Sequence, residues 1–196
     1  MITRAPFLKT PTFDRRLPLW PVWTSAGKRV VIRLAEESDY PLVGALHSRC
    51  SPESLHSRYL SGRRDIRLPE WRHLVDPAVG WTWVALPEED PGRVVAVSHV
   101  LRADTGDHTT GELAVLVEDR WQGQRLGSQL ARAALSRSLA HGLKSVVVVT
   151  NGTNTRMVRI CKALGAAVPR TFSPLIEMTF TSSPLSTACE GPTEYV

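Results

Sequence analysis

The sequence GELAVLVEDRWQGQRLGSQLARAALSRSLAHG, residues 111–142, decides the fold of this chain. Its first part, Leu113–Val117, is a short apolar and β-branched run with polar residues at both ends, which is typical of a strand buried on both faces. From Leu126 the apolar residues recur at helical spacing, with Leu130 on the same side, and Gly142 is a helix stop signal. The stretch therefore predicts a strand, a glycine-bearing turn and a helix.

The predicted turn has the features of a phosphate-binding site. The first turn of a helix leaves backbone N–H groups without partners and carries the positive end of the helix dipole. Gly123 and Gly127 have no Cβ atom, so a phosphate can approach the backbone closely. Two glycines before a helix also occur in ordinary strand-to-helix turns, and the turn alone does not separate the two interpretations.

The run Val117–Ser128 resembles the acetyl-CoA signature of the GNAT superfamily of N-acetyltransferases, in which Gln/Arg-x-x-Gly-x-Gly/Ala opens a helix after a strand. Gln122 stands at the Gln/Arg position, and Gly127 lies near the second glycine. Against the common wording Arg-Gly-Lys-Gly-Ile-Gly, this chain has Gln-Gly-Gln-Arg-Leu-Gly, so that five of six positions are compatible and Arg125 departs.

A later segment strengthens the resemblance, which covers about residues 28 to 180. A second family pattern, Asn-x-x-Met…Leu-Gly, is matched at the right spacing by Asn154, Met157, Leu164 and Gly165. A chance glycine turn would not be followed by that pattern, so the phosphate-binding interpretation is favoured over the ordinary turn.

The order of predicted elements is also that of the GNAT fold. Strands are expected at 29–34, 81–86, 93–102, 112–117, 144–150 and 175–180, and helices after a Ser38 cap, after a Ser51 cap, and at 68–75, 126–141 and 155–164. The fold class implied is α/β (α+β), a mixed and mostly antiparallel sheet of six to seven strands flanked by helices, with splayed central parallel strands. Residues 1–26 are expected to form an extended proline-rich arm, 27–181 the GNAT domain, 104–107 a turn, and 182–196 a disordered tail.

The resemblance implies acetyl-CoA as cosubstrate. Backbone amides of the turn would bind its diphosphate, Gln122 would hold the loop, and the pantetheine arm would lie between Val115–Val117 and Val147–Thr150, with an amide of Val115 or Val117 directed at the thioester oxygen. Asn154 is expected to contact that arm, to cap its helix, or both. The expected cofactor-binding residues are Val115, Leu116, Val117, Gln122, Gly123, Gln124, Arg125, Leu126, Gly127, Ser128 and Asn154.

Two positions depart from the family pattern. If the position of Arg125 requires a positive φ, a non-glycine residue costs about 1–2 kcal/mol there. A guanidinium beside phosphates offsets that cost through charge-assisted hydrogen bonds, unless Arg125 simply faces solvent. Cys161 stands where many GNAT enzymes have a Tyr that protonates the departing thiolate, although this Tyr is not expected in the protein-lysine branch.

Transfer to an alkyl amine requires a proton acceptor, because only about 0.1% of such an amine is neutral near pH 7. Glu112 is expected on the same strand face as Ala114 and Leu116, beside an apolar run, where partial desolvation would raise its pKa. In the bacterial protein-lysine acetyltransferases, which Ser51-Pro52-Glu53-Ser54 and Arg58-Tyr59-Leu60 resemble, a Glu at this place is the general base. The alternative is a strand-end carboxylate facing water, with Glu118 and Asp119 as the next candidates.

Composition excludes several other classes. The formal charge is +5, but Arg and Lys are scattered rather than clustered, so no nucleic acid is expected as a partner. No apolar run approaches the roughly 18 residues that span a bilayer, and residues 1–21 contain no hydrophobic signal core. The histidines are not at metal-ligand spacings, so no metal is expected. The odd number of cysteines, Cys50, Cys161 and Cys189, argues against disulfides and for a cytoplasmic protein.

Three functions are consistent with these observations. The leading hypothesis is an acetyl-CoA-dependent N-acetyltransferase, a monomer or homodimer, that modifies a protein lysine by direct attack with Glu112 as base. The second is transfer to a small amine such as an aminoglycoside or polyamine. The third is a non-catalytic domain that binds acetyl-CoA and regulates another process.

Overall fold

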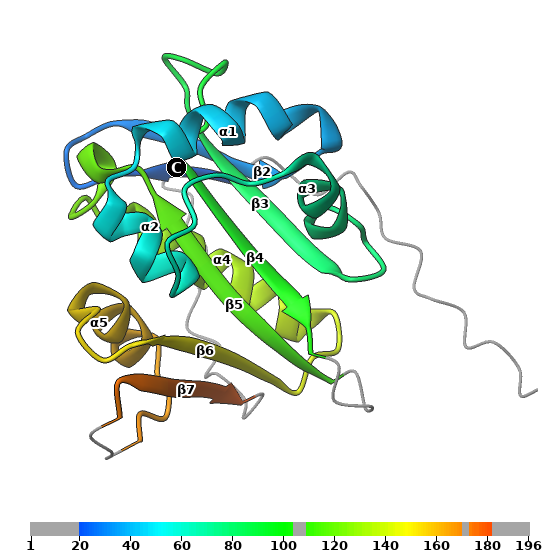
Figure 1. The fold of residues 1–196 in the computed structure, drawn as a ribbon, viewed down its shortest axis with the longest axis vertical. Helices are drawn as coiled ribbons and strands as arrows, with labels where there is room; N and C mark the ends of the chain where they lie inside the picture. Colours follow the sequence, from blue (N-terminus) through cyan, green and yellow to red (C-terminus); the bar gives the residue numbers. More distant parts are fainter. Residues whose placement is uncertain (1–19, 104–108, 170–172, 182–196) are drawn as a thin grey trace, which may run out of the picture.

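The computed structural model describes residues 20–103, 109–169 and 173–181. The expected tail at 182–196, the turn at 104–107 and most of the proline-rich arm lie outside these residues. The described part forms one seven-stranded sheet with helices on both faces (Figure 1), and the α/β (α+β) fold predicted from the sequence is confirmed.

The strands follow one another across the sheet in chain order. They are β1 (Trp20–Trp23), β2 (Arg29–Leu34), β3 (Gly80–Pro87), β4 (Ala96–Arg102), β5 (Thr110–Val117), β6 (Ser145–Asn151) and β7 (Leu175–Thr181). All neighbouring strands pair antiparallel except β5 and β6, which are parallel because the helical crossover between them returns the chain to the same edge. The predicted antiparallel meander of three strands is β3, β4 and β5.

Five α-helices and two short 3-10 turns cover the sheet in the described ranges. They are η1 (Glu37–Asp39), α1 (Tyr40–Arg49), α2 (Pro52–Tyr59), α3 (Leu68–Leu74), η2 (Asp119–Trp121), α4 (Leu126–Ala140) and α5 (Thr155–Ala163). Figure 1 shows α1, α2 and α3 on one face, with α4 behind the sheet. Gly142 and Gly165, predicted as helix stops, both have positive φ angles of 96° and 89°, which a residue with a side chain rarely adopts.

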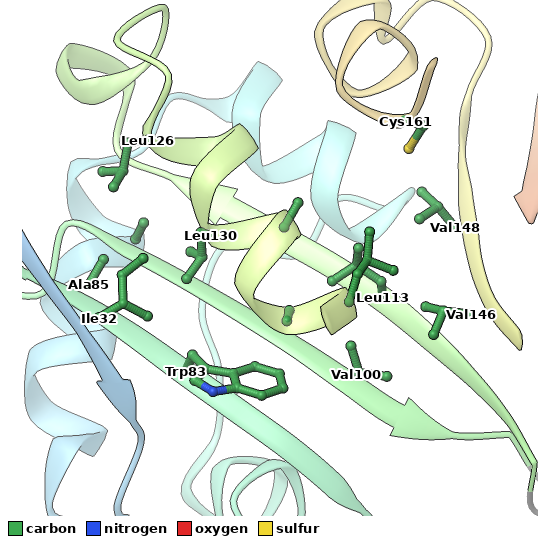
Figure 2. Packing of buried hydrophobic residues seen from close by; sticks show 14 of the residues in the cluster. Ile32, Trp83, Ala85, Val100, Leu113, Leu126, Leu130, Val146, Val148 and Cys161 are labelled. Carbon is green, nitrogen blue, oxygen red and sulfur yellow. The ribbon is translucent and has the colours of Figure 1, made fainter. Parts of the chain in front are cut away.

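A hydrophobic core lies on each face of the sheet. The larger one packs Leu126 and Leu130 of α4 against the inward side chains of β2 to β6 (Figure 2). Cys161 of α5 points at Val148 in the same core. The second core joins α1, α2 and α3 to the opposite face, with Trp71 fully buried in it. Burial on both faces explains why β5 reads as a continuous apolar run.

The structure differs from the sequence-based expectation at two places near the start of the domain. The sheet begins inside the stretch assigned to the arm, because Trp20–Trp23 pairs with β2 from Trp20↔Ile32 to Trp23↔Arg29. Ser38 does not cap α1, since it lies within the 3-10 turn that precedes the helix and Asp39 occupies the N-cap position. Asp39 is instead bound by both terminal nitrogens of the Arg33 guanidinium at 2.7 Å, so that a partly buried ion pair fixes the entry to α1.

None of the helices in the described ranges has the length and apolar character needed to cross a membrane.

Candidate functional site

The parallel strands β5 and β6 separate to form a groove. They pair only from Thr110↔Ser145 to Glu112↔Val147, although β5 continues to Val117 and β6 to Asn151. Beyond Glu112 the two strands diverge toward α2 and α5 (Figure 1). A cavity of about 500 Å³ occupies the space that opens between them, which confirms the predicted splay of the central strands.

The turn between β5 and α4 presents backbone amides to this groove. Arg125, the N-cap of α4, has φ 65° and ψ −2°, so this position does require the left-handed conformation that a glycine adopts without strain. Leu126, Gly127 and Ser128 form the first turn of α4, and their amides have no acceptor within the helix. The Arg125 side chain is exposed and lines the groove, so it faces both solvent and the place where a phosphate would bind.

Gln122 holds this loop to its surroundings. Its amide nitrogen donates hydrogen bonds of 2.9 Å to the Val117 carbonyl and to Ser54 Oγ, and its Oε1 accepts a hydrogen bond from Arg156. One side chain thereby joins the end of β5 to α2 and α5. The predicted loop-holding role of Gln122 corresponds to these contacts.

The two carboxylates after β5 are both occupied by structural contacts. Glu118 is buried and accepts hydrogen bonds from Arg49 at 2.9 Å and Arg93 at 2.8 Å, with Arg120 as a third guanidinium partner at 2.6 Å. Asp119 accepts hydrogen bonds from the Ser51 amide, Ser51 Oγ and Ser54 Oγ at 2.7–2.8 Å. Desolvation by itself would raise the pKa of Asp119, but these hydrogen bonds lower it below its ordinary value. Glu118 and Asp119 thereby connect α1 and α2 to the loop between β5 and α4.

Nine of the eleven predicted cofactor-binding residues line the groove. They are Val115, Leu116, Val117, Gln122, Gly123, Arg125, Gly127, Ser128 and Asn154. The Leu126 side chain is buried in the larger core, and the Gln124 side chain turns to the other side of the loop, where it donates to the Arg120 carbonyl at 2.7 Å. Neither residue lines the groove, although the sequence led us to expect their backbone amides at the diphosphate.

Asn154 is the N-cap of α5, the helix on the far side of the groove, and Cys161 lies within that helix. The Asn154 side chain caps α5 by accepting from the Met157 amide at 3.1 Å, and it donates to Thr150 Oγ1 at 3.0 Å. Capping is thus observed, and Asn154 also lines the groove. Burial raises the pKa of the Cys161 thiol to about 12, so Cys161 is a core residue that would protonate a leaving thiolate poorly.

A second cavity of about 530 Å³ adjoins the first on the face of the sheet covered by α2 and α3. Arg58 and Ala114 line both cavities and mark where they meet. Glu112 lines the second cavity, two residues before Ala114 on the same strand face. The partial desolvation expected of Glu112 is not found: its side chain is exposed, because the helices facing it leave this cavity open instead of covering the strand end.

Aromatic and cationic side chains that contact one another in series lie where the two cavities meet. Arg58 donates a hydrogen bond to Nε2 of His99, a residue of β4 that is 3% exposed. The Arg58 guanidinium also lies 4.6 Å from the centre of the Tyr59 ring. Tyr59 is held in turn by His47: Nδ1 of His47 contacts the Val43 carbonyl at 2.7 Å and must carry the proton, so its Nε2 accepts from the Tyr59 hydroxyl at 2.5 Å. Burial lowers the pKa of both histidines, and both are therefore neutral near pH 7.

The groove fits the anionic parts of acetyl-CoA. Four guanidinium groups line it, from Arg58, Arg125, Arg156 and Arg159, together with Gly127 and Ser128 of the first turn of α4. Diphosphate is the group that such a combination of amides and guanidinium groups binds. By contrast, no group of three His, Cys, Asp or Glu side chains suited to a metal ion occurs among the residues that the structure describes.

The acetyltransferase (GNAT) family matches residues 43–166, more than half of the sequence. The chain belongs to this GNAT acetyltransferase family. As a GNAT N-acetyltransferase it uses acetyl-CoA as its acetyl donor, and the groove between β5 and β6 has the position and the charge to bind it.

Solved structures show the same fold. The GNAT domain of S. lividans PAT is 17% identical, with a TM-score of 0.75 over 83% of this chain and 96% of that one. The yncA protein of Salmonella typhimurium, whose structure contains its cofactor acetyl-CoA, is 18% identical, with a TM-score of 0.65 over 82% of this chain and 99% of that one. A cAMP-binding acyltransferase from Mycobacterium smegmatis is 25% identical, with a TM-score of 0.61, and this chain covers 50% of it.

Several residues of the groove, on α2 and α5, were not among those predicted from the sequence. The missed residues that line the groove include Ser54, Ser57, Arg58, Arg156 and Arg159. Arg156 and Arg159 are spaced by three residues at the start of a predicted helix, which could have indicated a shared cationic face. Ser54 and Arg58 belong to the wording that resembles the protein-lysine acetyltransferases, but that resemblance gave them no place in the groove, and only the fold brings α2 beside β5.

Proposed function

We infer that this GNAT enzyme acetylates a lysine side chain of a protein and that Glu112 accepts the proton of the attacking amine. The observation that supports this proposal is the junction of two cavities at Arg58 and Ala114, with Glu112 on the acceptor side of the junction. An amine that enters the second cavity passes the carboxylate just before it reaches the end of the cofactor groove.

Other carboxylates near the junction are poorly suited to be the base. Glu118 is enclosed by three arginines, and Asp119 is held by two serines. Glu70 lines the second cavity, but the backbone amide and then the side chain of Arg67 lower its pKa to about 2. Glu112 makes no ion pair within the described ranges and interacts with Arg58 only through space, so no hydrogen-bonded cation occupies its carboxylate.

The charges of the second cavity favour lysine over a polycationic small molecule. An aminoglycoside or a polyamine carries several ammonium groups, each of which needs a carboxylate or comparable acceptor when it is desolvated. The cavity has two carboxylates, and Glu70 is already paired with Arg63 and Arg67. One unpaired carboxylate, Glu112, matches the single ammonium of a lysine side chain.

The acceptor class can be tested by incubating the protein with labelled acetyl-CoA and either a cell lysate or a panel of small amines. We expect labelled protein bands whose label is on lysine. Labelled small amines without labelled protein would contradict the lysine proposal, and tight cofactor binding without any label would contradict transfer to either class.

The role of Glu112 can be tested with Glu112→Gln, which keeps the shape of the side chain and removes the base. We expect kcat to fall by about 10²–10⁴-fold, with acetyl-CoA affinity unchanged. Glu177→Gln is the matched control, because Glu177 is an exposed strand carboxylate of β7 that lines neither cavity. Normal turnover by Glu112→Gln with bound cofactor would refute the role.

A further inference from the structure

Arg58 is a cation at the junction of the two cavities, and it interacts with the nearby Glu112 carboxylate only through space. It makes no ion pair with the residues that the structure describes, and its Nε atom is buried without a hydrogen-bond acceptor. Its one hydrogen bond in these ranges, to His99, goes to a neutral ring. The Glu112 charge compensates this buried guanidinium only in part, and a ligand oxygen that carries negative charge would complete the compensation.

The surroundings hold this guanidinium in one orientation. The Tyr59 ring lies beside it at 4.6 Å, and Tyr59 is fixed by its hydrogen bond to His47. His99 is buried on β4, opposite Ala114 of β5 in the sheet, so the hydrogen-bond acceptor of Arg58 belongs to a rigid element. Donors held in advance in this manner stabilise developing charge without reorganising during the reaction.

The location of Arg58 identifies the anion. Of the residues that the structure describes, Arg58 and Ala114 alone line both the cofactor groove and the acceptor cavity, so the guanidinium lies where the donor's acetyl group must meet the amine. When the amine nitrogen attacks, the new C–N bond pushes the carbonyl electron pair onto oxygen. The oxygen returns that pair as the C–S bond breaks, the amine proton passes to Glu112, and CoA leaves as the thiolate.

We propose that Arg58 is a catalytic residue that donates to the acetyl carbonyl oxygen and stabilises its negative charge, with His99 as the positioning residue that orients the guanidinium. This assignment rests on the proposed acetyl transfer at the junction of the two cavities, and it adds a cation to the backbone amide expected from β5. It holds whether the acceptor is a lysine or a small amine.

The first experiment compares Arg58→Gln and Arg58→Lys with the parent enzyme. We expect Arg58→Gln to lower kcat by about 100-fold, the loss seen for one oxyanion donor, with the Kd of acetyl-CoA unchanged. Arg58→Lys keeps the positive charge but loses the planar set of guanidinium donors, so its kcat is expected to lie between those of Arg58→Gln and the parent. Arg63→Gln is the matched comparison, because Arg63 also lies beside the Tyr59 ring, at 5.3 Å, but lines only the acceptor cavity. It should change the KM of the acceptor more than kcat.

The second experiment measures binding and needs no acceptor. The probe is trifluoroacetonyl-CoA, whose hydrated ketone places a tetrahedral oxygen near the position of the thioester oxygen. The parent protein should bind it at least about tenfold more tightly than Arg58→Gln does, whereas CoA should bind both equally. Thermal unfolding and CoA titration show whether each variant is folded. If the parent bound the ketone more tightly than Arg58→Gln does but acetylated no amine, the proposed function would be refuted and the assignment of Arg58 would stand.

His99 is tested by rescue. His99→Leu removes the hydrogen-bond acceptor of Arg58 and should lower kcat, whereas His99→Gln supplies an amide oxygen and should restore most of it. Equal kcat values for the two variants would assign His99 a purely structural role. Arg58→Gln that retains kcat and binds the ketone as the parent does would overturn the proposal. The proposal would also be overturned if Arg58→Gln changed only the KM of acceptors that carry a carboxylate, because Arg58 would then bind the acceptor.

Discussion

Arg125 allows the strain of the phosphate loop to be separated from its charge. The residue has φ 65°, which costs a residue with a Cβ about 1–2 kcal/mol relative to glycine. Its exposed guanidinium lines the groove beside the free amides of α4. Replacing Arg125 by Gly removes both the strain and the cation, whereas replacing it by Ala removes the cation and leaves the strain.

The two variants should therefore differ in stability and agree in affinity. A charge-assisted hydrogen bond contributes about 1.5–3 kcal/mol when enclosed, and the exposure of Arg125 places its share near 1 kcal/mol, or about fivefold in Kd. Both variants should bind acetyl-CoA about fivefold more weakly than the parent. Arg125→Gly should be more stable than Arg125→Ala by about 1 kcal/mol, which for a chain of this size is about 2–4 °C in Tm.

Isothermal titration gives the affinities and calorimetric unfolding gives the Tm values. The difference in Kd should shrink as salt is raised, because the guanidinium is exposed and screened. Arg132→Ala is the matched control: Arg132 is an exposed arginine of α4 that does not line the groove. Unchanged affinity in both Arg125 variants would remove the side chain from phosphate binding, and equal Tm values would contradict the strain assigned to this position.

Two further predictions concern stability. His47 and His99 are buried and neutral, and burial lowers both pKa values below the ordinary 6.5, so the unfolded chain binds more protons as the pH falls through 6.5. The free energy of unfolding, measured in urea, should accordingly fall from pH 7.5 to pH 5.5 by at most about 1.4 kcal/mol for each histidine, and a flat profile would refute neutral burial. Gly80→Ala would place a Cβ 2.2 Å from the Val100 carbonyl oxygen of the neighbouring strand and should cost about 1–3 kcal/mol or more. Gly44→Ala, in helix α1 with open space around it, should stabilise by up to about 1 kcal/mol, and similar Tm values for the two would contradict the close strand contact.

Much of the fold could be predicted because local and tertiary preferences agree along most of this chain. The apolar run ending at Val117 and the helical spacing from Leu126 are strong signals, and the structure has a strand and a helix there. Ser51 and Pro52 predicted the start of α2, where Ser51 does accept a hydrogen bond from the Ser54 amide. The prediction that Ser38 caps α1 was wrong for a physical reason. A hydroxyl favours the N-cap position, but the ion pair between Arg33 and Asp39 sets the start of the helix one residue later.

The candidate site was less completely predictable. The backbone conformation of Arg125 and the tie from Gln122 to Val117 are local, and the family pattern indicated both positions. The exposure of Glu112 could not be predicted from its neighbours in sequence, because it depends on the separation between α3 and the end of the strand. The α2 residues of the groove and the contact between Arg58 and His99 join segments 41 residues apart, for which no spacing rule exists.

The sequence by itself therefore determined the elements, their order and the glycine-bearing turn that lines the groove. These follow from periodicity and backbone geometry, which act over a few residues. Only the tertiary structure decided where the two cavities meet, which carboxylates are engaged by arginine or serine, and which cation lies at the junction. Those features depend on the packing of α2 and α3 against the sheet, where distances between atoms are set by elements far apart in the chain.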